Sequence, residues 1–285
     1  MRFLVLGCNG MAGHTISLYL QGQGHQVKGF ARQKSRITDT FVGDARDTAL
    51  VRQVLDSGYY DAAVNCIGVL NQFAEDDHEA AAYLNAYFPH FLAKMTANLK
   101  TMVVHISTDC VFSGKRGGYK ETDFPDGETF YDRSKALGEL CNQKDITIRS
   151  SIIGPDLRSD GIGLMNWFLQ QKGAVKGYKN AIWTGQTSLQ MAKTIEHMVK
   201  EKASGLYHMV PEASISKYEL LVLFNKHLRK QPIIIESDES VRVDKSLKRT
   251  NFTSFAYVVP DYEDQIYELG QWMKENKHLY PHYEL

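Results

Sequence analysis

The stretch Arg2-Phe3-Leu4-Val5-Leu6-Gly7-Cys8-Asn9-Gly10-Met11-Ala12-Gly13 leads from a short apolar run into three glycines with G-x-x-G-x-x-G spacing. A helical pattern follows at residues 15–20, so the glycines lie between a predicted strand and a predicted helix. Gly7 permits a tight turn, Gly10 lets the backbone approach a pyrophosphate, and Gly13 lets the helix pack closely on the strand. The alternative is an ordinary strand-to-helix turn. The dinucleotide contacts predicted in this loop are Gly7, Asn9, Gly10, Met11 and Gly13.

Short β-branched runs alternate with amphipathic stretches through the first half of the chain. Near-continuous apolar strands joined by helices are typical of parallel strands buried on both faces, so the pattern predicts an α/β fold with a doubly wound parallel sheet. After Gly154-Pro155 the elements become shorter and glycine-punctuated, which predicts a smaller C-terminal α/β lobe. We expect these two parts to span residues 1–150 and 151–285, with interleaved boundaries left open. The strands predicted in the first part are residues 3–6, 26–30, 62–66, 102–107 and 146–150.

The composition excludes several classes of protein. The 33 Lys and Arg residues balance 33 Asp and Glu residues, so no overall field attracts nucleic acid or an anionic membrane. The first apolar run is too short for a signal peptide or a membrane span. We therefore expect a cytoplasmic enzyme without nucleic-acid or membrane partners, in which a homodimer stays open and no metal site is predicted. The cysteines are scattered and are read as reduced, buried thiols: Cys8, Cys66, Cys110 and Cys141.

The end of the second predicted strand bears on cofactor choice. An NAD site usually places an acid there, about 20 residues past the glycine loop, to bond the adenosine ribose. Residues 29–35 contain no acid, whereas Arg32 with Lys34 or Ser35 could bind a 2′-phosphate. This favours NADP(H), with NAD(H) left open; the alternative is a solvated basic loop. Further predicted contacts are Asp44 and Ala45 near the adenine, and Cys66, Ile67 and Gly68 beside the dinucleotide.

Tyr131 and Lys135 are four residues apart, which puts both side chains on one face of a helix. An adjacent ammonium favours phenolate, so we expect Lys135 to lower the pKa of the Tyr131 phenol. Tyr131 could then give its proton to a ketone oxygen as hydride arrives, while Lys135 also bonds the nicotinamide ribose. A lone Tyr-x-x-x-Lys pair is weak evidence, because such pairs occur on many helices. Its place after the strand at residues 102–107 makes it specific.

Hydroxyl groups lie where that strand ends, at the sheet edge where ligands bind. Thr108 is the natural second donor to the substrate oxygen, and beside Tyr131 it would form a small preorganised oxyanion site. Ser107 is either catalytic or a strand-end hydroxyl that satisfies backbone groups. Asp109 is expected to cap the following turn.

With these residues the chain resembles the extended short-chain dehydrogenases, and among them the dTDP-4-dehydrorhamnose reductases. The resemblance implies a Rossmann domain, a sugar-nucleotide-binding C-terminal lobe, and reduction of a 4-keto group on a nucleotide-linked 6-deoxy sugar by NAD(P)H. It also implies Thr108, Tyr131 and Lys135 as catalytic residues. The matching segments are 7–13, Asn65 to Gly68, Asn85-Ala86, the block Ser107-Thr108-Asp109-Cys110-Val111-Phe112-Ser113-Gly114, Tyr119-x-Glu121-x-Asp123, 131–135 with Gly138-Glu139, and Gly205-Leu206-Tyr207-His208.

The substrate side matches the family less closely. Cys110 stands where these reductases usually have tyrosine, and residues 150–154 lack their tryptophan. The segment that begins at Trp183 is only loosely similar to their substrate loop. Two substrates therefore stay open, dTDP-4-dehydrorhamnose and a UDP-linked N-acetylated analogue. Besides Thr108 and Tyr131, the predicted substrate contacts are Asp109, Cys110, Trp183, Lys248 and Arg249; the last two, with Lys245, could neutralise a diphosphate or form a solvated face.

Two other functions stay open for a chain with this resemblance. One is a non-catalytic NADP-binding regulatory subunit, similar to that of methionine adenosyltransferase, which would not need the aligned phenol and ammonium. The other is an epimerase that retains NAD and returns the hydride to the sugar. A retained cofactor usually accompanies an acidic ribose partner, which residues 29–35 lack.

Overall fold

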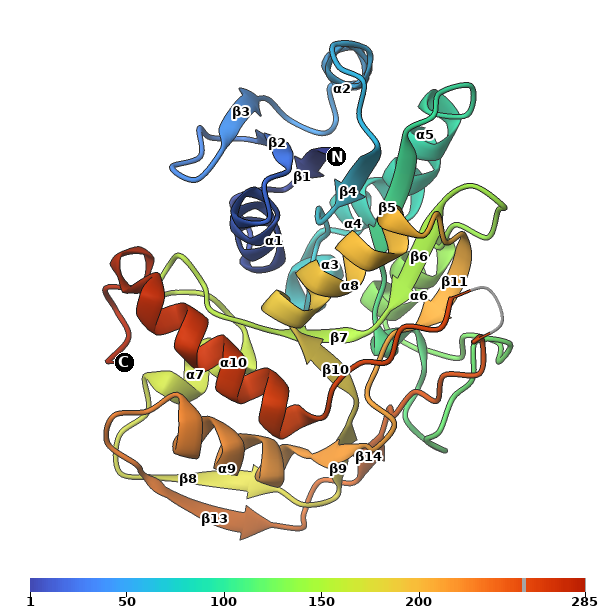
Figure 1. The fold of residues 1–285 in the computed structure, drawn as a ribbon. Coiled ribbons are helices and arrows are strands. Elements are labelled where there is room, and N and C mark those ends of the chain that lie inside the picture. Colours follow the sequence, from blue (N-terminus) through green and yellow to red (C-terminus); the bar gives the residue numbers. More distant parts are fainter. Residues whose placement is uncertain (253–254, 285) are drawn as a thin grey trace.

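The computed structural model describes residues 1–252 and 255–284 and is built around a seven-stranded, fully parallel sheet (Figure 1). The strand order is β11-β6-β5-β4-β1-β2-β3. The order reverses between β1 and β4, so the crevice outside their carboxyl ends is where such folds bind ligands. The strands are β1 (Arg2–Leu6), β2 (Gln26–Ala31), β3 (Asp39–Val42), β4 (Ala62–Asn65), β5 (Met102–Ile106), β6 (Ile146–Arg149) and β11 (Gly205–His208). The predicted doubly wound sheet is confirmed.

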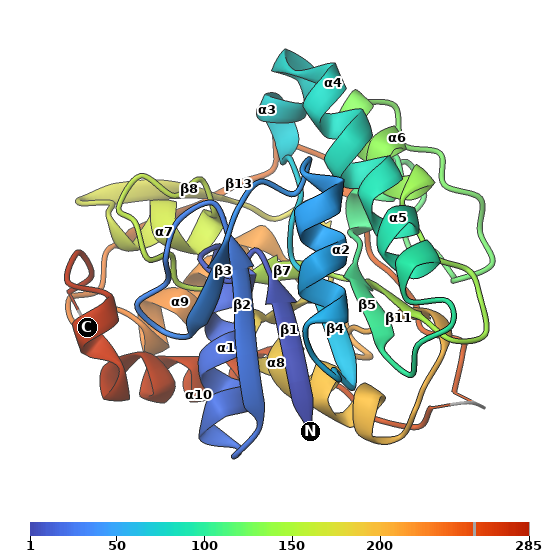
Figure 2. The same cartoon turned by 90° about the horizontal axis from the view of Figure 1, so that it is seen from above.

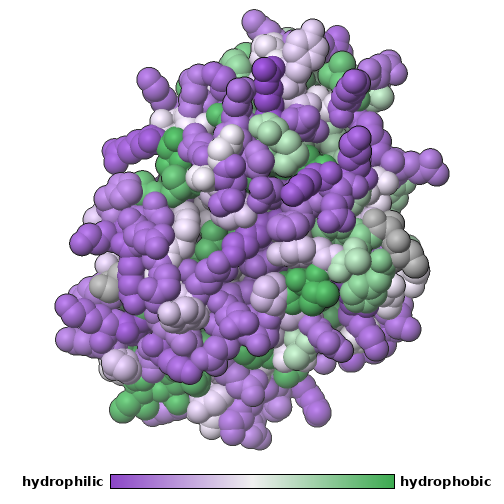
Figure 3. Space-filling view, viewed as in Figure 1, coloured by the Kyte–Doolittle hydropathy of each residue, from purple (hydrophilic) through white to green (hydrophobic). Residues whose placement is uncertain are grey.

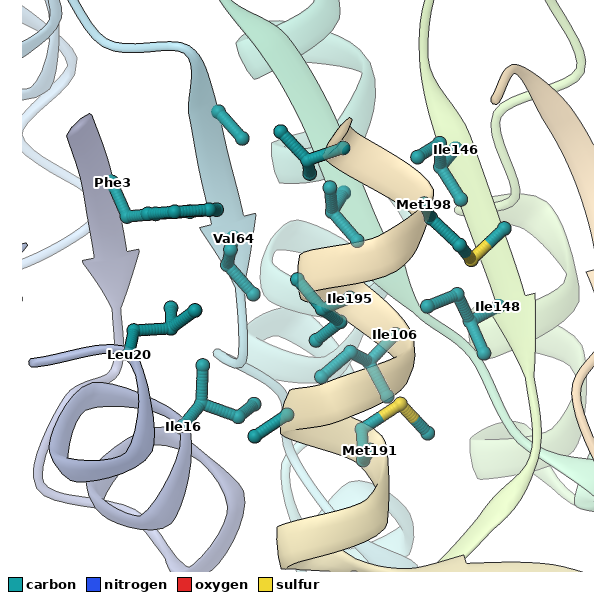
Figure 4. Packing of buried hydrophobic residues seen from close by; sticks show 14 of the residues in the cluster. Phe3, Ile16, Leu20, Val64, Ile106, Ile146, Ile148, Met191, Ile195 and Met198 are labelled. Carbon is teal, nitrogen blue, oxygen red and sulfur yellow. The ribbon is translucent and has the colours of Figure 1, made fainter. Parts of the chain in front are cut away.

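Helices cover both faces of this sheet (Figure 2). Helices α1 (Met11–Gly22) and α8 (Ser188–Lys200) pack against one face, where Ile16, Ile195 and Met198 meet the strand side chains in a single apolar cluster (Figure 4). Helices α2 (Thr48–Asp56), α5 (Phe88–Met95) and α6 (Phe130–Leu137) lie on the other face. Because both faces are covered, the central strands β1, β4, β5 and β6 are almost continuously buried, as their apolar sequences predict.

The second lobe is assembled from small pieces with an apolar core of their own. Two strand pairs and a three-stranded sheet accompany its helices. The strands are β7 (Ser151–Ile153), β8 (Ala174–Tyr178), β9 (Ala181–Trp183), β10 (Gly185–Thr187), β12 (Ile215–Ser216), β13 (Ile234–Asp238) and β14 (Val243–Asp244). The helices are α7 (Leu164–Leu169), α9 (Lys217–His227), α10 (Tyr262–Glu275) and the 3₁₀ turn η3 (Lys277–Leu279).

The chain does not divide cleanly at residue 150. Helix α8 and strand β11 come from the second range, yet α8 packs on α1 and β11 pairs with β6 at the edge of the central sheet. The two parts are therefore interleaved, as the prediction from the sequence had left open. The reason is that β6 would otherwise be an exposed sheet edge, and β11 supplies its missing partner.

The segment between β4 and β5 is an irregular helical stretch. It contains α3 (Asn71–Asp76), α4 (His78–Ala81), the π-helix η1 (Ala82–Tyr87) and then α5. Pro89 lies in the first turn of α5, where a missing backbone N–H costs no helical hydrogen bond. A short 3₁₀ turn, η2 (Asp109–Val111), follows β5.

Within the described ranges, no helix is both long and apolar enough to cross a bilayer. The face in Figure 3 is largely hydrophilic, and its apolar residues form separate patches.

Candidate active site

The glycine loop has the steric form that its spacing predicts. Gly7 has φ +83°, a left-handed conformation that favours glycine. A Cβ on Gly13 would lie 2.1 Å from the carbonyl oxygen of Gly7, so only glycine lets α1 start this close to β1. Gly10 is the N-cap of α1 and no side chain caps it. The first-turn amides are thus not used by a capping side chain, which suits an anionic ligand.

The segment after β4 lies directly beside this loop. A Cβ on Gly7 would meet the Ile67 side chain at 3.1 Å and the Cys66 carbonyl at 3.2 Å. The buried Asn85 side chain in η1 holds the segment, since it accepts from the Val69 N–H (2.8 Å) and donates to the Val69 carbonyl (2.9 Å). A Cβ on Gly68 would meet Asn85 Oδ1 at 3.1 Å. The structure therefore brings Cys66, Ile67 and Gly68 to the crevice where the loop opens.

The predicted adenine end is positively charged. Arg32 is exposed just after β2, and the Asn9 side chain donates to the carbonyl of Gln33 (2.9 Å). Asp44 accepts from the Arg46 backbone N–H (2.9 Å), and its carboxylate pairs with the Arg46 guanidinium (3.3 Å). The side-chain hydrogen bond from Arg46 is the main cause that lowers the pKa of Asp44. Ala45 is buried beside it.

Tyr131 and Lys135 lie on α6, as predicted. Thr129 and Asp132 form a capping box that fixes where this helix begins. The Glu75 carboxylate accepts from the Tyr131 N–H (3.0 Å) in the same first turn. Both side chains are buried, and Lys135 Nζ donates to the carbonyl of Ile106 (2.7 Å) at the end of β5. The helix thus places the phenol and the ammonium at the carboxyl edge of the sheet.

The expected lowering of the phenol pKa is wrong in this structure. Burial raises the pKa of Tyr131 well above its ordinary value, and a hydrogen bond with the Thr108 hydroxyl opposes this only in part. Burial also lowers the pKa of Lys135 to about 8, with Glu139 acting in the opposite direction. The physical reason is that a buried phenolate loses its hydration, and the ammonium is itself buried and bonded to Ile106. The phenol is therefore protonated at neutral pH and is available as an acid.

Thr108 is the residue that caps η2, which corrects the cap predicted at Asp109. Its Oγ1 accepts from the Cys110 N–H (3.1 Å) and donates to the Asp109 carboxylate (3.0 Å). Asp109 is buried and also accepts from the Ser151 hydroxyl (2.8 Å). Cys110 is half-buried and packs in the small cluster that contains Tyr131, and burial raises the pKa of its thiol to about 12. Asp109 therefore orients the Thr108 hydroxyl. The Cys110 thiol is uncharged at neutral pH and packs beside the Tyr131 phenol.

Ser107 donates to a buried carboxylate. Its hydroxyl bonds Glu139 Oε1 (2.8 Å), and Glu139 forms a two-bond ion pair with Arg149 at 2.6 and 2.7 Å. Arg149 also lies over the Phe112 ring. This places Ser107 in a network that joins β5, β6 and the end of α6 beneath the site.

The predicted substrate contacts in the second lobe are brought together only in part. Trp183 is buried in the lobe core, with its ring against Tyr262. Arg249 is also buried, and its guanidinium donates to the backbone carbonyls of Asn251, Phe255 and Tyr257. Packing within the lobe therefore engages both of these side chains. Lys248 is exposed.

Of the three basic residues considered for the diphosphate, Lys245 is the one whose side chain lies beside α6. Its Nζ lies 4.0 Å from Asp132 Oδ1 on α6, and its charge lowers the pKa of Cys110 against the larger effect of burial. Its side chain packs at Gly114, where an added Cβ would meet Lys245 Cγ at 2.9 Å.

Comparison with known proteins agrees with this fold. Residues 1–256 match the family described as the RmlD substrate binding domain. The chain belongs to this family. The resemblance to the extended short-chain dehydrogenases and to the reductases among them is thereby confirmed.

Individual RmlD relatives carry reductase names. The probable low-salt glycan biosynthesis reductase Agl14 of Haloferax volcanii is 26% identical over 264 residues, 87% of each chain. The dTDP-4-dehydrorhamnose reductase of Mycobacterium tuberculosis is 28% identical over 144 residues, 48% of this chain and 44% of that protein. The solved dTDP-4-dehydrorhamnose reductase of Bacillus anthracis in complex with NADP has a TM-score of 0.78 at 20% identity, over 94% of this chain and 98% of that one. This last likeness shows the fold.

Several residues of this RmlD site carry no pattern that sequence reasoning could use. Glu75 stands in an ordinary polar segment, and only the fold brings it to Tyr131. Arg46 lies two residues from Asp44, so their ion pair is a local contact that sequence reasoning did not consider. Asn85 was visible as part of a family motif, although its contact with Val69 was not. In the described ranges, no group of three or more His, Cys, Asp or Glu side chains could hold a metal ion.

Proposed function

We propose that this protein uses NADPH to reduce the 4-keto group of a nucleotide-linked 6-deoxy sugar in the synthesis of surface polysaccharide precursors. One observation carries the proposal: Tyr131, Lys135 and Thr108 are buried together at the carboxyl edge of β5, in the same crevice as the glycine loop. The reductase names of the relatives support the reaction class. The sugar is either dTDP-4-dehydrorhamnose or a UDP-linked N-acetylated analogue.

The nicotinamide cofactor supplies a hydride to the sugar C4. Tyr131 gives its proton to the ketone oxygen, so that the ketone gains one hydride and one proton and becomes an alcohol. Thr108 donates a hydrogen bond to the same oxygen once its hydroxyl turns from Asp109, and together the two donors stabilise the developing oxyanion. Lys135 holds the nicotinamide ribose and favours the phenolate that remains on Tyr131 after proton transfer.

The loop residues fit a dinucleotide diphosphate. The uncapped first turn of α1 presents backbone amides, and the glycines leave room for close approach. Arg32 is exposed just after β2, and we assign the contact with a 2′-phosphate to it. No acid occupies the end of β2, and Arg46 adds a second cation near Asp44. These features support a preference for NADP(H) over NAD(H).

On the substrate side we assign a diphosphate contact to Lys245 in place of Arg249. The side chain of Lys245 is anchored at Gly114 and ends beside Asp132 and Cys110, whereas Arg249 is committed to backbone carbonyls. We assign the protein to the cytoplasm, where scattered thiols stay reduced. The prediction that all four thiols are buried is wrong for Cys141, which is exposed.

The test is to incubate the purified protein with NADPH and a panel of dTDP- and UDP-linked 4-keto-6-deoxy sugars. We expect one mole of NADPH to be oxidised for each mole of 4-hydroxy product formed with one of the nucleotide carriers. In Tyr131→Phe we expect turnover to be slower by roughly 10²- to 10⁴-fold. If NADPH binds but no sugar nucleotide is reduced, the regulatory-subunit alternative replaces this proposal. If the protein carries tightly bound NAD and changes sugar stereochemistry without net NADPH use, the epimerase alternative replaces it.

A further inference from the structure

The C-terminal segment is hydrogen-bonded to the helix that begins at the glycine loop. His14, in the second turn of α1, is fully buried, with Nδ1 2.9 Å from the carbonyl oxygen of Gly10 and Nε2 2.8 Å from the Tyr280 hydroxyl. The two rings meet edge to face, with centroids 5.8 Å apart. Tyr280 follows α10, which belongs to the lower lobe in Figure 1, and is separated from His14 by 266 positions in the chain.

The direction of these hydrogen bonds follows from elementary chemistry. A carbonyl oxygen only accepts, so Nδ1 of His14 carries a proton and donates to Gly10. Burial lowers the pKa of His14 to about 4, so the ring is neutral at neutral pH and Nε2 is an acceptor. The Tyr280 hydroxyl therefore donates to Nε2. The result is one directed chain from Tyr280 through His14 to the Gly10 carbonyl.

The Gly10 carbonyl belongs to the same peptide unit as the Met11 N–H. This unit is planar and trans, so its N–H points opposite to its C=O. The carbonyl accepts both the His14 backbone N–H (3.0 Å) and the imidazole (2.9 Å), and its orientation is thereby fixed. The Met11 N–H is a first-turn donor at the end of α1 where an anion binds. Fixing the carbonyl consequently fixes the direction of that donor.

The same C-terminal segment also forms hydrogen bonds within the second lobe. The Tyr283 hydroxyl donates to Asn166 Oδ1 (2.6 Å) and accepts from the Asp156 N–H (3.0 Å). The segment that Asp156 belongs to begins at Gly154, where an added Cβ would meet Met11 Sδ at 3.1 Å. Tyr280 thus bonds α1 on the cofactor side, and Tyr283, three residues later, bonds the segment that leads from Gly154 into the substrate lobe.

We propose that His14 and Tyr280 are positioning residues that set the Met11 amide for the dinucleotide diphosphate, so that the substrate lobe helps to hold the cofactor loop. This rests on the proposed function in one respect, that a nicotinamide dinucleotide binds at this loop. Neither residue touches the reacting atoms. Their loss should weaken cofactor binding and leave the chemical step unchanged.

Tyr280→Phe keeps the ring and removes the donor to His14. We expect the Kd and KM for NADPH to rise roughly 3- to 10-fold, the range for losing one net hydrogen bond. At saturating NADPH, kcat and the KM for the sugar nucleotide should stay at wild-type values. The matched control is Tyr262→Phe, a buried tyrosine of the same lobe whose hydroxyl has no bond to α1 within the described residues. It should leave NADPH binding unchanged.

Binding of two cofactor fragments distinguishes a local effect of Tyr280→Phe at the diphosphate from a general loosening of the structure. ADP-ribose contains the diphosphate and should lose affinity for Tyr280→Phe in parallel with NADPH. Adenosine 2′-monophosphate lacks the diphosphate and should bind both proteins equally. Equal weakening of both ligands would mean that the variant only loosens the lobe, and the proposal would be overturned.

A pair of nearly isosteric variants covers the case in which Tyr280→Phe folds poorly. His14→Asn keeps an N–H that can donate to Gly10, whereas His14→Leu has the same shape without a donor. Asn should retain more NADPH affinity than Leu at similar thermal stability. Unchanged NADPH affinity in Tyr280→Phe and in His14→Leu would refute the positioning role alone, because wild-type binding would still stand. Failure of the wild type to bind any nicotinamide dinucleotide would refute the proposed function instead.

Discussion

Lys135 Nζ on α6 lies 2.7 Å from the carbonyl oxygen of Ile106, the last residue of β5. This bond ties the helix that carries Tyr131 to the strand that leads into Ser107 and Thr108. The ammonium is fully enclosed, and burial lowers its pKa to about 8. A cofactor ribose would give this buried cation further acceptors, because one carbonyl leaves two of its three N–H donors free for other partners.

The first prediction concerns the proton donor. Tyr131→Phe removes the hydroxyl and keeps the buried ring, so kcat should fall roughly 10²- to 10⁴-fold while the Kd for NADPH stays nearly unchanged. Stopped-flow turnover with the active 4-keto sugar nucleotide and an NADPH fluorescence titration measure both quantities. A folded variant that still turned over at the wild-type rate would rule out Tyr131 as the acid.

Tyr131 and Lys135 should behave as a unit. Lys135→Met removes the contact to the ribose and the charge beside the phenol, so we expect both NADPH affinity and kcat to fall. Adding Lys135→Met to Tyr131→Phe should lower kcat little further, since the two residues share one task. Additive losses of kcat in the double variant would contradict a shared role.

The pH profile should report the Lys135 ammonium. Its pKa in the folded protein is about 8, below the ordinary value of 10.5, because of burial. The ammonium is therefore lost as pH rises through about 8, and kcat/KM should decline above that pH. The unfolded chain keeps this proton up to its ordinary pKa, so the Lys135 contribution to the free energy of unfolding should rise between about pH 8 and 10.5. Urea titrations at several pH values in this range give the free energy of unfolding. Its slope against pH should be steeper for the wild type than for Lys135→Met.

Cofactor preference should depend on Arg32. Arg32→Asp replaces the proposed 2′-phosphate contact with a like charge, so NADPH should lose about 1.5–3 kcal/mol of binding free energy or more, and NADH much less. Arg52→Asp, an equally exposed change on α2, is the control. Steady-state KM values for both cofactors provide the measurement. Equal use of NADPH and NADH by the wild type would contradict the assignment.

The substrate-side cation should be Lys245. Lys245→Met keeps the length of the stem that packs at Gly114 and removes the charge. We expect the KM for the sugar nucleotide to rise roughly 10-fold or more, as for one charged hydrogen bond, with the KM for NADPH unchanged. Lys248→Met, at an exposed neighbouring position, should have little effect. A larger rise of the KM for the sugar nucleotide in Lys248→Met than in Lys245→Met would assign the diphosphate contact to Lys248.

The buried ion pair below the site should matter for stability. Arg149→Met leaves the Glu139 carboxylate buried without its partner, which typically costs about 3–5 kcal/mol of the free energy of unfolding. Arg158→Met breaks a solvent-exposed pair with Asp160 and should change the free energy of unfolding far less, because water screens that pair. Urea denaturation of the two variants measures the difference. Similar midpoints would mean that the buried pair is dispensable.

Much of the fold and the core of the site could be predicted because their signals are local. Strands β1, β2, β4, β5 and β6 follow from apolar runs, whereas β3 was not predicted because Asp39–Val42 is short and partly exposed. The glycine spacing prescribes the turn at Gly7 and the close packing at Gly13. The i,i+4 spacing places Tyr131 and Lys135 on one helix face whatever surrounds the helix. Each of these features depends on residues close together in the chain.

The remaining features depend on contacts that no local pattern contains. Only the tertiary structure buries Trp183 and Arg249 in lobe packing, brings Lys245 to Asp132, and adds β11 to the edge of the sheet. The direction of the Tyr131 pKa shift was also decided there, because enclosure by distant segments removes water from the phenolate more effectively than a neighbouring ammonium can compensate. His14 and Tyr280 likewise meet only when the chain has closed on itself, so the sequence could name the glycine loop but not the residues that hold it.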